Sequence, residues 1–314
     1  MLTRRHIRVK VLQSVYAYKQ TENPNIDIQE KFLHHSIGQM QDLYLLMIQL
    51  LLAVQDQAEV FLTRSQKKHL ATAKEKNPSR TFIDNKVLQI ITENTAFSDA
   101  IEKRNLNYWA LDDEYPTIIF NELRALEWYK TYLDKKETTF KEDRDFVVSV
   151  FKKVIAPNDK LYEYLEDKRL TWIDDFPLVN TAIVKMLGKL SEDNASALLT
   201  PRLYKNEEDR EYALQLFRKV ILNEEKLNEH IAGKTPNWDQ ERIADLDLII
   251  LKMGIAEFLY FPSIPVRASI NEYLEVSKEY STPKSSIFVN GILDKIVKEF
   301  SETGELNKIG RGLQ

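Results

Sequence analysis

The chain has 314 residues, among them only 8 Gly and no Cys, and its 44 basic and 48 acidic residues give a formal net charge of −4. The absence of Cys excludes disulfides, thiolate metal sites and cysteine nucleophiles. Glycine is scarce compared with its usual share of about 7%. This scarcity disfavours sandwiches, barrels and glycine-loop nucleotide folds, whose tight turns need positive φ. A net negative charge ordinarily argues against nucleic-acid binding.

Helical periodicity begins with the first residues and continues along most of the chain. Thr3 is a candidate N-cap for a helix over 3–20, in which apolar side chains recur every three or four residues. The same spacing predicts three further helices in the first half, over 27–65, 85–103 and 115–135. Polar segments predict loops over 67–80 and 104–114. No segment alternates β-branched and polar residues, so the sequence predicts an all-α fold.

The longest apolar run is too short for a membrane span. It covers Leu43–Val54, twelve residues that include Gln49, whereas a bilayer span needs about 20. No apolar segment of the signal-peptide type follows the basic start of the chain. We therefore expect a buried core helix at this run and a cytoplasmic protein without membrane contact.

The chain also repeats part of itself. Residues 142–172 align without a gap with 208–238, and twelve of 31 positions are identical, where roughly two would match by chance. With one residue inserted, the match extends so that 142–190 repeats 208–257. Each copy is predicted to hold two helices, near 142–166 and 176–190 in the first and near 208–232 and 240–260 in the second. Convergence of similar helices is the alternative, but the shared Asp-Arg start and the pairing of Trp172 with Trp238 favour duplication.

The first twenty residues form a basic cluster. They contain five basic residues and no acidic one, a local charge of +5 that leaves −9 for the other 294 residues. Arg4, Arg5 and Arg8 fall in the first turns of the predicted helix, where the helix dipole disfavours cations. An external anion would reverse this effect, and guanidinium groups suit phosphate. The alternatives are a solvated basic end or an intramolecular partner for the acidic surplus.

Two segments carry family motifs. One is the opening RRHIRVKVLQSVYAYKQ (4–20), and the other is 241–299, which contains Ile264-Pro265, Ile270-Asn271-Glu272 and Phe288-Val289-Asn290-Gly291. They resemble the first helix and the closing helices of the NusB transcription antitermination factors. The resemblance covers about residues 1–60 and 206–302.

This resemblance implies an all-α protein of small NusB-like helical bundles, enlarged here by an inserted helical region that contains the duplicated helix pair. It divides the chain into four parts. These are N-terminal NusB-like helices over 1–66, a helical insertion over 67–205, a C-terminal NusB-like helical domain over 206–302 and a flexible tail over 303–314.

The resemblance also implies a function. The family binds boxA-type single-stranded RNA of ribosomal RNA transcripts as a heterodimer with ribosomal protein S10 (NusE), acts on the transcription elongation complex and catalyses nothing. By position, six residues of this chain are expected on the RNA surface: Arg4, Arg5, Arg8, Tyr16, Lys284 and Phe288. The aromatic members would stack on unpaired bases, although both Tyr16 and Phe288 could instead belong to the core. Asp247 falls at an acidic position on the side that faces S10.

Enzyme functions find no support in the sequence. It has no histidine pair in metalloprotease spacing, no G-x-S-x-G motif and no phosphate-binding glycine loop, so we expect no catalytic residue, metal site or cofactor. The alternative to RNA binding is a helical protein–protein scaffold that keeps S10-type contacts without RNA readout. If the arginines bind RNA, they should be exposed on one side and free of intramolecular acidic partners.

Overall fold

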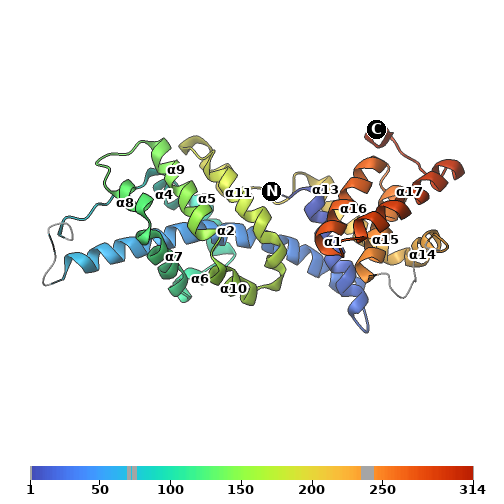
Figure 1. The fold of residues 1–314 in the computed structure, drawn as a ribbon, viewed down its shortest axis with the longest axis horizontal. Coiled ribbons are helices and arrows are strands. Elements are labelled where there is room, and N and C mark those ends of the chain that lie inside the picture. Colours follow the sequence, from blue (N-terminus) through green and yellow to red (C-terminus); the bar gives the residue numbers. More distant parts are fainter. Residues whose placement is uncertain (1, 69–71, 73–75, 235–243, 314) are drawn as a thin grey trace. The chain divides into compact units, whose positions relative to one another are not determined.

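In the computed structural model, residues 2–68, 72, 76–234 and 244–313 are described. Within these ranges every regular element is helical and no strand occurs, so the predicted all-α fold is confirmed (Figure 1). The chain forms two compact units. Unit 1 comprises Met1–Ile37 and Leu203–Gln314, and unit 2 comprises Gly38–Arg202. The long helix α2 (Ile26–Gln66) belongs to unit 1 at its start and to unit 2 after Ile37.

Unit 1 is built around one mostly apolar helix. Its helices are α1 (Arg4–Gln20), the start of α2, α13 (Glu207–Leu222), α14 (Glu224–Ile231), α15 (Asp245–Tyr260), α16 (Val266–Tyr280) and α17 (Ser285–Thr303). Helix α15 is buried on nearly all sides, as expected for a helix whose sequence is mostly apolar. It packs against α1, α13, α14, α16 and α17. Gly304, with φ of 74°, ends α17 in the left-handed conformation that glycine adopts easily.

Unit 2 contains shorter helices around the second part of α2. They are α4 (Lys86–Thr92), α5 (Thr95–Lys103), α6 (Tyr108–Leu111), α7 (Glu114–Ala125), α8 (Glu127–Leu133), α9 (Phe140–Val150), α10 (Asp159–Lys168), α11 (Phe176–Leu187) and α12 (Ala195–Leu199). A π-helical turn over Phe151–Ile155 continues α9, and short 3-10 turns cover Leu170–Asp175 and Glu192–Asn194. The prediction of a helix over 27–65 agrees with α2.

Two predicted helices and one predicted loop are wrong in detail. The helix expected over 85–103 is broken at Asn94, whose side chain caps α5 by accepting a hydrogen bond from the Phe97 amide at 2.9 Å. The helix expected over 115–135 is divided at Leu126, which has an extended backbone. The loop expected over 104–114 contains the short helix α6, because Trp109 is buried and its Nε1 donates to the carbonyl of Leu46 at 2.9 Å. Local periodicity does not reveal these tertiary anchors.

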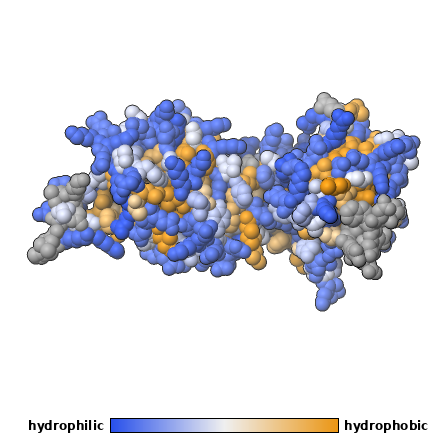
Figure 2. Space-filling model, in the orientation of Figure 1, coloured by the Kyte–Doolittle hydropathy of each residue, from blue (hydrophilic) through white to orange (hydrophobic). Residues whose placement is uncertain are grey.

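The apolar run in α2 lies in the core of unit 2. Helix α2 is long and apolar enough to cross a bilayer by composition alone, but most of Leu43–Val54 is buried against other helices. Figure 2 shows hydrophilic side chains over most of the visible face, with apolar side chains in separate patches. A helix segment buried in this way is typical of a protein core.

The helix order in the two predicted repeat copies is the same. Helix α9 with its π-helical turn corresponds in position to α13, α10 to α14 and α11 to α15. The first helix predicted in each copy, near 142–166 and near 208–232, is in fact interrupted. The interruptions lie before α10 and before α14. Phe151 and Phe217, which occupy equivalent positions, are both fully buried. Trp172 is buried and its Nε1 donates to the carbonyl of Gln39, whereas Trp238 lies outside the described residues.

The structure adds a further helix to each copy of the repeat. Helix α4 packs on α9 as α1 packs on α13. The two first helices share a Lys-Val-Leu-Gln motif, at 10–13 in α1 and 86–89 in α4. Val and Leu of both motifs are buried. The duplication hypothesis therefore extends to four helix positions, and superposition of 142–190 on 208–257 would test it.

Phe151→Ala and Phe217→Ala should each lower the free energy of unfolding by about 3–5 kcal/mol, because each ring is fully buried at an equivalent position of its own unit. Urea denaturation followed by circular dichroism measures this loss. Glu229→Ala, at an exposed position of α14, is the control and should change little. A Phe151→Ala variant as stable as the wild type would contradict the equivalence of the two cores.

Candidate functional site

The arginine cluster occupies the first two turns of α1. Thr3 is the N-cap, and its amide and hydroxyl lie 3.3 and 2.7 Å from Nδ1 of His6 in a capping box. No acidic residue lies in this first turn. Residues three and four apart share one face of a helix, so Arg4, Arg5 and Arg8 project together from the start of α1.

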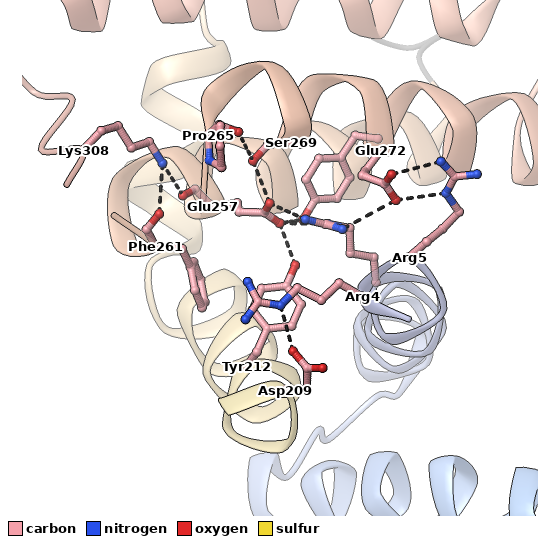
Figure 3. A network of polar contacts seen from close by, with 12 residues as sticks. Arg4, Arg5, Asp209, Tyr212, Glu257, Phe261, Pro265, Ser269, Glu272 and Lys308 are labelled. Atoms are coloured by element: carbon pink, nitrogen blue, oxygen red, sulfur yellow. Dashed lines mark hydrogen bonds and ion pairs between the residues drawn. The ribbon is translucent and has the colours of Figure 1, made fainter. Parts of the chain in front are cut away.

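All three arginines are paired with acids of unit 1. Arg4 donates from Nε to Asp209 at 2.8 Å and from Nη2 to Glu208 at 2.6 Å, and both acids lie at the start of α13. Arg5 makes a bidentate pair with Glu272 of α16, with both bonds at 2.9 Å (Figure 3). The expectation of arginines free of acidic partners is therefore wrong. The anion that offsets the helix dipole is internal and comes from acids about 200 or more residues later in the chain.

Arg8 forms the buried centre of the cluster. Its side chain is 3% exposed and donates two hydrogen bonds to the fully buried carboxylate of Glu257, at 3.0 and 2.5 Å. The same carboxylate accepts hydroxyl hydrogen bonds from Tyr212 at 2.7 Å, Ser269 at 2.6 Å and Tyr273 at 2.8 Å. One carboxylate thereby joins α1, α13, α15 and α16.

The protonation states in this network follow from its contacts. Burial by itself would raise the pKa of Glu257, but the charge and hydrogen bonds of Arg8 and the hydroxyl donors outweigh it and hold this pKa below its usual value. Burial and the neighbouring carboxylate raise the pKa values of Tyr212 and Tyr273 well above their usual value. The network therefore holds an ionised pair with neutral tyrosines at neutral pH.

A pocket of about 640 Å³ opens beside the cluster. Arg4, Arg5 and Arg8 line one side, and Glu272 with the connection between α15 and α16 lines another. Arg311, from the C-terminal segment, also lines the pocket. The side chains of Arg4 and Arg5 are 28% and 42% exposed, so these two guanidinium groups face solvent, whereas Arg8 does not.

The other predicted RNA-surface residues lie apart from the residues that line this pocket. Tyr16 is 40% exposed on α1, and its position eleven residues after Arg5 puts it on nearly the same helix face, about 16 Å along the axis. Lys284 is exposed at the start of α17. Phe288 is buried in the core of unit 1, which agrees with the alternative that it is a core residue. Its ring therefore cannot stack on a base in this structure.

The predicted partner-facing acid is also buried. Asp247 is 5% exposed, and its Oδ2 accepts a hydrogen bond from Ser285 Oγ at 2.7 Å. The expectation that its side chain faces another protein is not met in this structure. An acid in the first turn of α15 stabilises the positive end of the helix dipole, so its local role is structural.

Sequence reasoning missed the acids and the fourth arginine of the site. Glu272 stands within the Ile-Asn-Glu motif, but nothing in the local pattern indicates its pairing with Arg5. Glu257 could have been found from its position, because an acid in the apolar sequence that follows the first turn of α15 requires a buried partner. Among the residues that the structure describes, no group of three or more His, Asp or Glu is placed to hold a metal ion.

Comparisons with known proteins agree with the motifs. Residues 178–298 match the NusB family. The chain is 38% identical over 123 residues to a transcription antitermination protein NusB of Salinibacter ruber, covering 39% of this chain and 77% of that protein. It is 42% identical over 104 residues to the one of Chloroherpeton thalassium, covering 33% and 49%. It is 40% identical over 94 residues to that of Methylacidiphilum infernorum, covering 30% and 66%. No solved structure matches the chain.

Glu257→Gln should lower the free energy of unfolding by about 3–5 kcal/mol at neutral pH, because it leaves the guanidinium of Arg8 buried without its counter-charge. Since the folded-state pKa of Glu257 is depressed, its contribution is present above the usual value of 4.5 and is lost as the pH falls below it.

Urea denaturation at neutral and at acidic pH measures both effects. The difference in the free energy of unfolding between the wild type and Glu257→Gln should become smaller at acidic pH. Glu302→Gln, at an exposed position near the end of α17, is the matched control and should have little effect. An equal difference in the free energy of unfolding at both pH values would contradict the ionised state of Glu257.

Proposed function

Since the chain belongs to the NusB family, we propose that it is a transcription antitermination factor that binds boxA-type single-stranded RNA of ribosomal RNA transcripts together with ribosomal protein S10 (NusE). Three similar proteins are named as transcription antitermination proteins. The RNA, S10 and the transcription elongation complex are implied by the motifs in 4–20 and 241–299. The proposed activity is binding rather than catalysis, in the cytoplasm with the transcription machinery.

The observation that supports RNA binding most directly is the pocket lined by Arg4, Arg5 and Arg8. Guanidinium groups bind phosphate through two parallel hydrogen bonds. The pocket combines such groups with an opening to solvent, and it lies at the start of α1, where the family motif has its arginines. This arrangement is suited to a phosphodiester of a single-stranded RNA.

The internal acids do not prevent this binding. Arg5 and Glu272 are both partly exposed, and an ion pair in such a setting contributes only about 0–1 kcal/mol. A phosphate can therefore replace the carboxylate of Glu272 on Arg5 at small cost. At Arg4 the exchange is available at Nη2, whose partner Glu208 is about half exposed, whereas the hydrogen bond from Nε to the buried Asp209 stays in place.

Arg8 has a different role in this proposal. Its pair with Glu257 is buried, and removal of either partner leaves an uncompensated charge in the core. Arg8 is therefore a positioning residue that fixes the start of α1 against α15 and α16. The RNA contacts are assigned to Arg4 and Arg5, with Tyr16 as an exposed aromatic on which a base can stack and Lys284 as a more distant cation.

The alternative is a helical protein–protein scaffold that keeps S10-type contacts without RNA readout. One observation favours it, namely that all three arginines of α1 already have acidic partners. The two functions differ in whether a phosphate displaces these acids. Substitution of either Arg5 or Glu272 distinguishes the two functions.

Arg5→Ala should weaken binding of a boxA-type RNA and reduce the slope of log K against log salt by about 0.7, the effect of one phosphate contact on a single strand. Glu272→Gln should act in the opposite direction and strengthen binding, because it removes the carboxylate that competes for Arg5. Fluorescence anisotropy across a salt series, with and without S10, measures both.

Lys298→Ala is the charge-matched control, since Lys298 is exposed on α17 and does not line the pocket. It should leave RNA affinity nearly unchanged. RNA binding that is absent in the wild type, while S10 still binds, would favour the scaffold. Arg4→Ala and Arg5→Ala variants that bind RNA as well as the wild type would also reject the proposed site.

A further inference from the structure

The C-terminal segment after α17 is docked on unit 1. The sequence predicts a flexible tail over 303–314, whereas Gly310–Leu313 forms a 3-10 turn and the preceding residues make specific contacts. Lys308 donates from Nζ to the carbonyls of Glu257 at 3.2 Å and Phe261 at 3.0 Å (Figure 3). The amide of Ile309 donates to the carbonyl of Pro262 at 3.1 Å.

These contacts add a charged donor at the C-terminal end of α15. The carbonyls of Glu257 and Phe261 already accept backbone hydrogen bonds from the amides of Phe261 and Ile264, and Lys308 adds a second donor to each. A basic side chain at this end of a helix is also favoured by the helix dipole. The segment is thereby attached to the backbone of Glu257, whose carboxylate holds Arg8.

Gly312 fits closely against the same connection. It is buried, and a Cβ atom at this position would lie 1.9 Å from the carbonyl oxygen of Pro262. Any larger residue would therefore displace the segment. This close approach fixes the neighbouring residue, Arg311, at the edge of the pocket that Arg4, Arg5 and Arg8 line.

Arg311 differs from the other arginines of the pocket in its charge balance. Arg4, Arg5 and Arg8 each have a carboxylate within ion-pair distance. Arg311 is exposed, and in the part of the chain that the structure describes it makes no ion pair. It therefore contributes a positive charge that no described acid offsets, beside the guanidinium groups of Arg4 and Arg5, each of which has an acidic partner that is at least partly exposed.

We propose that Arg311 is an RNA-contacting residue, which the docked C-terminal segment holds at the pocket so that it binds a backbone phosphate next to Arg4 and Arg5. This inference rests on the proposed RNA-binding function. The ligand chemistry is a phosphodiester of single-stranded RNA, which a planar guanidinium contacts through two hydrogen bonds. No acid has to be displaced from Arg311, so it can take up the first phosphate.

Two variants separate charge from position. Arg311→Ala removes the cation and leaves the docked backbone, and we expect affinity for a boxA-type RNA to fall on the order of fivefold at low salt, with a salt slope reduced by about 0.7. Gly312→Ala keeps every charge but displaces the segment, and it should cause a similar loss. Arg311→Lys should recover part of the affinity, because it keeps the charge without the planar fork.

Fluorescence anisotropy of the full chain measures these effects, with Lys298→Ala as the control and Arg5→Ala as the reference. If Arg5→Ala weakens RNA binding and Arg311→Ala does not, the inference on Arg311 fails while the proposed function stands. If Gly312→Ala binds RNA as well as the wild type, the positioning by the docked segment is refuted.

If neither the wild type nor any variant binds RNA, the proposed function itself fails and takes the inference with it. A loss of S10 binding in Arg311→Ala, with RNA affinity unchanged, would assign the segment to the protein partner and overturn the proposal. Thermal denaturation of each variant shows whether a loss of affinity comes from unfolding instead. Equal melting temperatures with the expected loss would support the proposal.

Discussion

The buried ion pair between Arg8 and Glu257 is the interaction on which the structure of unit 1 depends. The carboxylate of Glu257 accepts hydrogen bonds from α1, α13 and α16, while its backbone carbonyl accepts one from Lys308. Removing two charges from water is costly, and only good geometry with all hydrogen bonds satisfied repays it. The five donors around this carboxylate meet that condition. Four helices and the C-terminal segment are thereby held in one arrangement.

This network divides the arginine cluster into two functional classes. Arg8 is inside and keeps its partner, whereas Arg4 and Arg5 each have an acidic partner that is at least partly exposed. The net charge of −4 is thus a poor guide to binding. Part of the acidic surplus neutralises the first helix internally. Under the proposed function, an RNA would meet exchangeable ion pairs beside Arg311, which makes no ion pair with the residues that the structure describes. The energetic difference between a buried and an exposed ion pair decides which arginine can change partner.

Unit 2 retains the helix order of the repeat without this buried charge pair. In the alignment of the copies, Phe146 stands opposite Tyr212 and Leu190 opposite Glu257, and both Phe146 and Leu190 are buried. Apolar residues in place of a buried ion pair are often neutral or stabilising. The core of a unit of this kind therefore does not require the charge. Its retention in unit 1 agrees with a role in placing the arginines rather than in stability alone.

The sequence by itself determined the all-α fold, the core position of Leu43–Val54, the family and the place of the arginine motif at the start of the chain. Periodicity and motifs depend on residues that are close in sequence, and composition depends on the sequence as a whole. All three can therefore be recognised before the structure is known. Only the tertiary structure decided four further features. These are the acidic partners of Arg4, Arg5 and Arg8, the burial of Asp247 and Phe288, the helix breaks at Asn94 and Leu126, and the docking of Arg311. Each depends on contacts with residues distant in sequence or on packing at a helix end, and no local pattern records which distant group will lie there.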